Sequence, residues 1–261
     1  LEQRGRGEAV GAMDPGARDL AGGVQAGDGR PATEVGNHAS AGVMRGRHDG
    51  DPLAGDIHGC IKTLQAVYKK LINETEEVYT VGDLIDRGPS SKSVVQFCID
   101  KNIKFTKGNH EDMLIEAVEH PNENNILIHY RNGGIKTAKS YVDKSSIDSY
   151  LEYFDEIKSL GHYEYLKHLP LTFEFPKVVI SHAGIIEGGD RETILWNKSI
   201  ELQQLDKLQI IGHTPYRSYL YYEDYYINID TGCVYDNKLT GIVVDIHTGK
   251  LIKTFEEYCK D

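Results

Sequence analysis

The chain has 261 residues, of which 39% are hydrophobic, so it can bury a core in one large domain or two small ones. Its net charge of -11 argues against a nucleic-acid scaffold, and no apolar run reaches the roughly 18 to 20 residues that a membrane-spanning helix needs. We therefore expect no nucleic-acid partner and no membrane partner, while the oligomeric state stays open.

The cysteines are few and lie far apart in the sequence. Cys60, Cys98, Cys233 and Cys259 include no C-x-x-C pair. Such spacing suits reduced thiols in a cytoplasm better than a disulfide framework or a zinc ribbon. We also read no signal peptide, because no basic segment precedes an apolar one at the start. The expected location is the cytoplasm.

Residues 1–53 differ in composition from the rest of the chain. They hold 12 of the 27 glycines and 6 of the 10 arginines, but no lysine, isoleucine or aromatic residue. A segment with so little to bury should not fold alone, so we expect a disordered or non-native leader followed by a folded domain at 54–261. A cloning junction near residue 50 and a natural disordered extension would each explain the change in composition.

From residue 54 the pattern is strand, charged loop and helix. Apolar residues at helical spacing predict helices over 61–72 and 90–100, with a buried strand over 76–81 between them. A short strand and another helix follow over 103–118, and 141–169 is mostly helical. Strand-rich pieces come next, at 172–175, 177–184, 208–215, 226–233 and 239–255. This order predicts an α/β protein with mixed sheets covered by helices.

Five loops share one design, in which an apolar run and a small residue precede side chains that can bind metal. The loops are "GDIHG" (Asp56, His58), "GDLIDRG" (Asp83, Asp86, Arg87), "GNHE" (Asn109, His110, Glu111), "SHAG" (His182) and "GHTP" (His213). A lone buried histidine is usually a satisfied core residue and a lone Asp-Gly loop is usually a turn. Five such loops behind five strands favour convergence on one divalent metal centre, because ligands gather at the carboxyl ends of strands. Carboxylates with imidazoles suit manganese, iron or zinc better than calcium.

In this order the loops resemble the calcineurin-like metallophosphoesterases of the phosphoprotein phosphatase type. The similarity is greatest to small phage and bacterial serine/threonine phosphatases, and "RNGG" (131–134), "LWN" (195–197) and "IDTGCV" (229–234) resemble pieces of that group. The resemblance covers about 54–246. It implies two mixed β-sheets packed as a sandwich, flanked by helices, and makes 54–261 a catalytic domain.

The resemblance also implies the metal ligands. One ion would be held by Asp56, His58 and Asp83, and the other by Asp83, Asn109, His182 and His213, with Asp83 bridging. Two divalent ions are implied, manganese first and iron or zinc as alternatives, roughly 3.5 to 4 Å apart. A hydroxide held between them would attack phosphorus directly.

The remaining loop residues would handle the substrate. His110 would protonate the leaving oxygen, Asp86 would orient His110, and Arg87 would offer its planar fork to two phosphate oxygens. A surface ion pair is the plainer explanation for Asp86 and Arg87. Glu111 is expected to be structural, favouring the dipole of the helix that follows it.

Two features depart from the family pattern. Lys198 follows "WN" where relatives carry an arginine that contacts phosphate, so it either makes a single-point phosphate contact or projects into water. The segment before Asp56 is "HDGDPLA" instead of an apolar run, and Pro52 cannot donate to a sheet ladder. We therefore expect a truncated first strand if the leader replaces native residues.

The function implied first is a two-metal phosphomonoesterase that hydrolyses phosphoserine and phosphothreonine in proteins, so its partner would be a phosphoprotein or phosphopeptide. The alternative is symmetrical hydrolysis of diadenosine tetraphosphate, because the same metal core attacks phosphorus in both reactions. A third hypothesis, an inactive phosphate-binding module, would need a missing ligand or acid, and none is missing.

Overall fold

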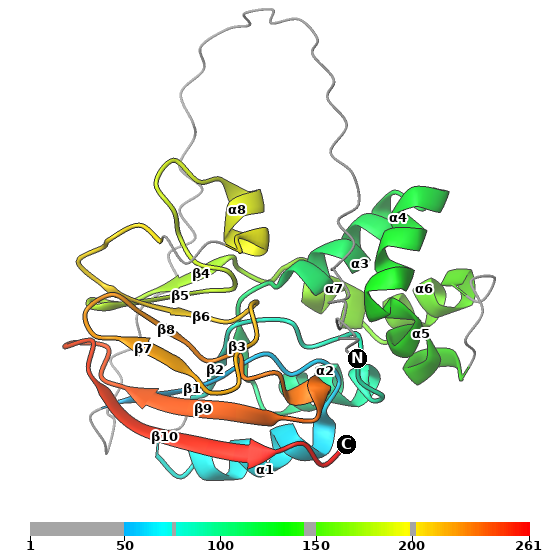
Figure 1. The fold of residues 1–261 in the computed structure, drawn as a ribbon. Coiled ribbons are helices and arrows are strands. Elements are labelled where there is room, and N and C mark those ends of the chain that lie inside the picture. Colours follow the sequence, from blue (N-terminus) through cyan, green and yellow to red (C-terminus); the bar gives the residue numbers. More distant parts are fainter. Residues whose placement is uncertain (1–49, 75–76, 144–149, 199–201) are drawn as a thin grey trace, which may run out of the picture. The chain divides into compact units, whose positions relative to one another are not determined.

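The computed structural model describes residues 50–74, 77–143, 150–198 and 202–261 (Figure 1). The strands are β1 (Asp51–Ala54), β2 (Tyr79–Thr80), β3 (Lys104–Phe105), β4 (Thr172–Glu174), β5 (Val178–Ser181), β6 (Leu208–Ile211), β7 (Leu220–Tyr222), β8 (Tyr226–Asn228), β9 (Lys238–Val244) and β10 (Leu251–Tyr258). The helices are α1 (Ile61–Leu71), α2 (Ser91–Asp100), α3 (Asn109–Glu119), α4 (Glu123–His129), α5 (Ile135–Val142), α6 (Tyr150–Ser159), α7 (His162–Lys167) and α8 (Arg191–Trp196), with short turns η1 (Tyr130–Gly134) and η3 (Cys233–Tyr235). The leader at 1–49 lies outside the described residues.

The first sheet has the strand order β10-β9-β1-β2-β3. Strands β1, β2 and β3 run parallel, and β9 pairs antiparallel with both β1 and β10. In β1, Leu53 lies opposite Tyr79 on one side and Ile242 on the other. The parallel strands therefore occupy the middle and one edge of the sheet, and their carboxyl ends face the same way.

The second sheet also has five strands, in the order β4-β5-β6-β8-β7. Its inner strands β5, β6 and β8 are parallel, while β4 and β7 are antiparallel edges. The inner strands are short and almost wholly apolar, as expected for parallel strands that are covered on both faces.

One hydrophobic cluster joins the two sheets face to face. It takes alternate residues from each strand, because successive side chains of a strand point to opposite faces. Its buried members are Leu53, Tyr79, Val81, Val178, Ile180, Leu208, Ile210, Ile227, Ile229, Ile242 and Val244. The cluster is the core of a β-sandwich.

The helices cover the other face of the first sheet. A larger cluster runs from Ala54 in β1 through α1, α2 and α3 to Tyr153 in α6 and Leu166 in α7. In Figure 1 the helices α3 to α7 gather on one side of the sheets. The structure therefore confirms the predicted architecture of two mixed sheets flanked by helices. No helix among the described residues is long and apolar enough to cross a membrane.

The first strand corrects a prediction. Residues 51–53, which composition assigned to the leader, belong to β1, and β1 is a central strand. Pro52 is tolerated because β2 pairs only with Leu53 and Ala54, so the proline precedes the part of the strand that is paired on both sides. The strand has only four residues, but it pairs with both β2 and β9, and three of its residues are buried.

Candidate metal centre

Each of the five loops with predicted metal ligands follows the carboxyl end of a parallel strand. The loops after β1, β2 and β3 come from the first sheet, and those after β5 and β6 come from the second. Five residues of these loops have a positive φ, namely His58, Asp83, Asp86, Arg87 and His213. Such conformations cost on the order of 1 to 3 kcal/mol each in non-glycine residues and are held only where the surroundings fix them. Backbone strain is thus concentrated at this end of the sandwich.

Glu111 holds two of these loops together. Its buried carboxylate accepts hydrogen bonds from the backbone N–H groups of Asp83 at 3.0 Å, Leu84 at 2.9 Å and Gly108 at 2.9 Å. Burial raises the pKa of Glu111 to about 7. Glu111 is therefore structural, as expected, but it acts by holding the loops after β2 and β3 together more than by favouring the dipole of α3.

Two loop glycines lie against ligand carboxylates. A Cβ at Gly108 would come within 2.1 Å of Oδ1 of Asp83, and one at Gly212 within 2.0 Å of Oδ1 of Asp56. No side chain fits at either position. The glycines of "GNHE" and "GHTP" therefore allow the backbone to approach the carboxylates closely.

Asp83 lies between two groups of potential ligands. Its Oδ2 is 3.4 Å from Nε2 of His58, and its Oδ1 is 3.4 Å from Nε2 of His182. Within 4.8 Å, ligand atoms of Asp83 cluster with those of His58 and His110 on one side and with those of His182 and His213 on the other. This is the arrangement that a carboxylate bridging two ions requires.

The ligand group formed by Asn109, His182 and His213 brings the lone pairs of three uncharged side chains close together. Nδ1 of His182 donates to the carbonyl of Val81 at 2.8 Å, so Nε2 of the neutral ring carries a lone pair. That atom lies 2.9 Å from Oδ1 of Asn109, which is itself 3.1 Å from Nδ1 of His213. Burial lowers the pKa of both histidines, that of His213 to about 3. Neutral acceptors facing one another in a buried site fit a cation between them.

Asp56 is the least satisfied of the predicted ligands. Its Oδ2 accepts a hydrogen bond from the backbone N–H of His213 at 2.9 Å, but its buried Oδ1 receives none from the described residues. Burial, together with the charges of Asp230 and Asp83, raises the pKa of Asp56 well above its usual value. Three crowded carboxylates and an orphaned oxygen also fit a metal cation.

In this structure the guanidinium of Arg87 occupies the position beside His58 where a metal cation would bind. Its Nδ1 donates to the carbonyl of Ile85 at 2.9 Å, and Nη1 of Arg87 donates to its Nε2 at 2.7 Å. Burial lowers the pKa of His58 to about 3, so the ring is an acceptor. The guanidinium also lies 5.7 Å from the ring centroid of Tyr235. Arg87 therefore reaches the ligand that would hold the first ion.

His110 and Asp86 form a buried pair. Nδ1 of His110 is 2.7 Å from Oδ2 of Asp86, and both side chains are 0% exposed, which excludes a surface ion pair for Asp86. Burial opposes the charge on His110, but the carboxylates of Asp83 and Asp86 outweigh it and raise the pKa of His110. Its buried Nε2 has no hydrogen-bond partner among the described residues. The imidazole of His110 can therefore carry a proton on Nε2, the ring nitrogen that makes no hydrogen bond with the described residues.

Lys198 lies just after α8 and is exposed. It lines a small cavity with Tyr216 and Asn228. Burial and then the charge of His182 are the larger causes of the lowered pKa of His213, but the charge of Lys198 adds to them. Trp196, 37% exposed, packs edge-on against His213 at 6.3 Å between ring centroids. Both residues thus lie beside the second ligand group.

Several site residues were missed by the sequence analysis. Asp230, buried beside Asp56, appeared only as a letter of "IDTGCV", and burial raises its pKa to about 6. His129 and Thr137 bind Asp86 but precede and follow "RNGG" without any pattern of their own. Their contribution depends on how α4 and α5 pack beside the loop after β2, which no local spacing signals.

Comparison with known proteins agrees with this geometry. The family model of the calcineurin-like phosphoesterases matches residues 53–244. An asymmetrical bis(5'-nucleosyl)-tetraphosphatase, PrpE, of Halalkalibacterium halodurans is 28% identical over 228 residues, which span 73% of this chain and 88% of that protein. Serine/threonine-protein phosphatase 1 of Salmonella typhimurium is 26% identical over 200 residues, spanning 72% of this chain and 88% of that protein.

A solved structure shows the same fold. The crystal structure of a putative diadenosine tetraphosphatase superposes with a TM-score of 0.55 at 19% identity, covering 80% of this chain and 94% of that one. The superfamily expected from the loops is confirmed, whereas the narrower phosphoprotein phosphatase type is not separated from the tetraphosphatases. The chain belongs to the calcineurin-like phosphoesterase family, and its buried His/Asp cluster fits the binuclear metal site of that family.

Proposed function

We propose that this metallophosphoesterase hydrolyses a phosphoanhydride bond of bis(5'-nucleosyl) tetraphosphates. The observation that carries the proposal is the similarity to the Halalkalibacterium tetraphosphatase, which extends over 88% of that protein. The sequence analysis ranked this reaction second, in its symmetrical form. That relative is named asymmetrical, so the bond that is cleaved is left to experiment.

A polar groove beside the metal centre supports a nucleotide substrate. It has a volume of about 320 Å³ and is lined by Tyr216, Arg217 and Tyr235 among others. Tyr235 is 56% exposed and lies under the guanidinium of Arg87. An exposed aromatic ring stacks a base, and an arginine pairs with phosphate oxygens. A nucleoside bound there would lead its phosphate chain toward Arg87.

The chain's own residues have distinct roles in this reaction. Two divalent ions held by the clustered carboxylates and imidazoles would polarise the phosphoryl group and supply a nucleophile near neutral pH. Arg87 donates to phosphate oxygens, which draws it away from His58. His110 gives a proton from Nε2 to the leaving oxygen, while Asp86 keeps its Nδ1 protonated and its ring in place.

Phosphoserine and phosphothreonine hydrolysis is the second candidate. It is favoured by the similarity to the Salmonella serine/threonine phosphatase, which covers 88% of that protein. The same ligands, acid and arginine would serve it. What differs is the leaving group: an alkoxide needs a proton far more than a nucleotide phosphate does, so this reaction would depend more on His110.

A direct comparison of substrates tests the proposal. The purified protein, loaded with Mn²⁺, is assayed on diadenosine tetraphosphate, a phosphoserine peptide and an aryl phosphate, and the nucleotides are separated by chromatography. We expect the largest kcat/KM on the dinucleotide; ATP with AMP indicates asymmetrical cleavage, and ADP alone indicates symmetrical cleavage. A larger kcat/KM on the peptide would reverse the order of the two candidates, and no turnover of any substrate would leave the inactive binding module.

The variant Tyr235→Ala isolates the groove. We expect it to raise KM for the dinucleotide by about 5- to 160-fold, the scale of one lost stacking contact of about 1 to 3 kcal/mol, and to leave KM for the aryl phosphate unchanged. Exposed Tyr258 lies on β10, and Tyr258→Ala is the matched control. Equal KM values for Tyr235→Ala and the parent on the dinucleotide would remove the groove from the substrate site.

A further inference from the structure

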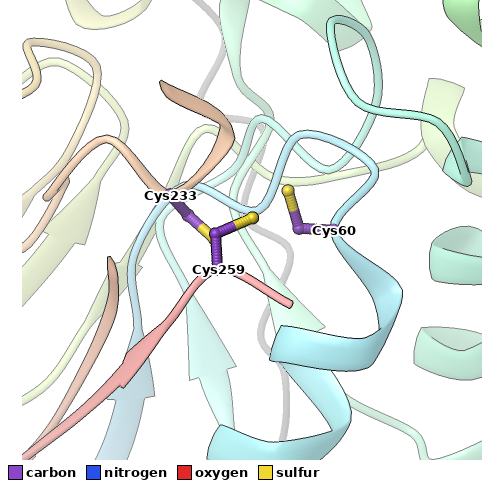
Figure 2. Close-up of side chains that lie close together, drawn as sticks. All are labelled: Cys60, Cys233 and Cys259. Carbon is purple, nitrogen blue, oxygen red and sulfur yellow. The ribbon is translucent and has the colours of Figure 1, made fainter. Parts of the chain in front are cut away.

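Three of the four cysteines meet in space although they are far apart in sequence. The sulfur atoms of Cys60, Cys233 and Cys259 all lie within 4.8 Å of one another. Cys60 and Cys233 are buried, at 1% and 2% exposure, and Cys259 is partly buried. Figure 2 shows the three side chains approaching from three different segments of the chain. The fourth cysteine, Cys98, is buried apart from them in α2.

We propose that these three thiols form a binding site for a single thiophilic d¹⁰ cation such as Zn²⁺ or Cu⁺. Thiolates select such ions over the harder ions that carboxylates prefer. Metal–sulfur bonds of about 2.3 Å place three sulfurs roughly 3.8 to 4.0 Å apart around one ion. The present separations are therefore no more than about 1 Å too wide, a change that side-chain rotation supplies. Each thiol that binds loses its proton to solvent.

This site is distinct from the His/Asp centre in its chemistry. The predicted catalytic ligands offer nitrogen and oxygen only, whereas this cluster offers sulfur only. A thiophilic ion thus prefers the cysteines, and manganese prefers the catalytic loops. Partly exposed Cys259 leaves one side of the cluster open, which gives an ion its path of entry.

The site would connect the end of β10 to two loops of the candidate metal centre. Cys60 directly follows the "GDIHG" loop, and its thiol donates to the carbonyl of His58 at 3.7 Å. Cys233 follows Gly232, whose N–H donates to Oδ1 of Asp230 at 2.9 Å. Cys259 directly follows the last residue of β10. One ion would therefore tie the end of β10 to the loops that hold Asp56, His58 and Asp230.

A disulfide is a different use of the same residues. It joins two sulfurs at about 2.05 Å and leaves the third thiol outside the bond. Such a bond needs two close cysteines and gives no reason for the third. The convergence of all three, from three segments, favours a shared ion.

Titration with Cd²⁺ tests the proposal, because Cd²⁺ gives an ultraviolet charge-transfer band only with sulfur ligands. The full chain is reduced with a non-thiol reductant, its catalytic site is filled with Mn²⁺, and Cd²⁺ is then added. We expect one Cd²⁺ per chain with this band. Cys98→Ala, the matched control, should behave like the parent.

Cys259→Ser should weaken Cd²⁺ binding by about tenfold or more. Loss of a residue that only hydrogen-bonds a metal ligand lowers metal affinity by about 10- to 100-fold, and loss of a direct ligand should cost at least as much. This residue is partly exposed, so the variant should fold, and its unfolding temperature without Cd²⁺ checks this. Added Cd²⁺ should raise the unfolding temperature of the parent and of Cys98→Ala more than that of Cys259→Ser.

Two results would overturn the proposal. The first is the absence of the band, or a band of the same strength and affinity in Cys259→Ser. The second is mass spectrometry showing that air oxidation removes two hydrogens by joining a pair of these cysteines while the reduced protein binds no Cd²⁺. That second result would assign the cluster to a disulfide.

Discussion

Oδ1 of Asp86 lies 3.1 Å from Nε2 of His129, while its Oδ2 lies 2.7 Å from Nδ1 of His110. One buried carboxylate therefore bridges two imidazoles. The hydroxyl of Thr137 donates to Oδ1 at 2.6 Å and fixes the carboxylate further. Burial opposes its charge, but His129 and His110 outweigh this and hold the pKa of Asp86 below its usual value. The orientation of the acid thus depends on α4 and α5 as well as on its own loop.

His129→Gln should slow turnover of alkyl phosphates by about tenfold, the lower end of what outer partners of a site cost. Glutamine keeps a hydrogen-bonding group but holds Asp86 less rigidly, so His110 is less well aimed. The loss should shrink on aryl phosphates, whose leaving group needs little protonation. Kinetics on both substrates, with metal content measured in parallel, check this.

His162→Gln is the matched control for that variant. His162 is as buried as His129, but its ring hydrogen-bonds Tyr141 and Gln96 instead of Asp86. It should change stability without an alkyl-to-aryl difference. If His129→Gln shows equal losses on both substrates, His129 is merely structural.

His110→Asn should keep both metal ions and slow hydrolysis of alkyl phosphates by about a hundredfold or more, the usual scale for a lost general acid. Its Nε2 is buried without a hydrogen-bond partner among the described residues, and asparagine places no proton there. On aryl phosphates the deficit should be smaller. Steady-state rates and elemental analysis provide the check, and an equal deficit on both substrate types would mean that His110 is not the acid.

Asp86→Asn should change the pH profile in a stated direction. The Asp83 and Asp86 carboxylates outweigh burial and raise the pKa of His110, so removal of one charge lowers that pKa. The acid form of His110 is then lost at a lower pH as pH rises. The alkaline limb of kcat on an alkyl phosphate should therefore move to lower pH. An alkaline limb at the parental pH would contradict this assignment.

Removal of the metal ions should abolish turnover, and added Mn²⁺ should restore it. The apo-protein should also unfold about 5 to 10 °C lower, because a ligand at about 100 times its Kd stabilises the folded state by about 2.7 kcal/mol. Activity, elemental analysis and thermal unfolding measure this. Full activity in a sample shown to be free of metal would exclude the two-metal mechanism.

Lys198 is tested by a pair of substitutions. Lys198→Arg should lower KM for the phosphate substrate about 3- to 10-fold, because a guanidinium makes two parallel hydrogen bonds where an ammonium makes one. Lys198→Ala should raise KM with a smaller change in kcat. Michaelis kinetics of the three proteins decide, and KM values within error of one another would mean that Lys198 projects into water.

The clustering of the predicted ligands could be anticipated from sequence because each of them lies within four residues of the carboxyl end of a strand. For His182 and His213, the strand end alone fixes where the side chain goes. Asp230 and His129 could not be predicted, since their neighbours come from segments far away in the chain. Glu111 was placed correctly as structural, but its hydrogen bonds to the loop after β2 depend on the pairing of β2 with β3.

The first strand shows a different limit. Pro52 argued against a paired strand, and the local argument is sound for residues paired on both sides. Pairing with β2 begins only at Leu53, so Pro52 is paired on one side alone, and only the register shows this. The residue at which a strand becomes paired on both sides depends on its partner strands, and the strand's own sequence does not show it.

The hydrogen bond from His213 to Asp56 joins residues that are 157 positions apart in the sequence. At a synthesis rate of about 5 to 20 residues per second, Asp56 leaves the ribosome roughly 8 to 30 s before His213. During that interval the growing chain carries the carboxylates of the first sheet without the histidines of the second. The centre can close only when β5 and β6 have been made and have docked, so catalytic competence is acquired late in biosynthesis.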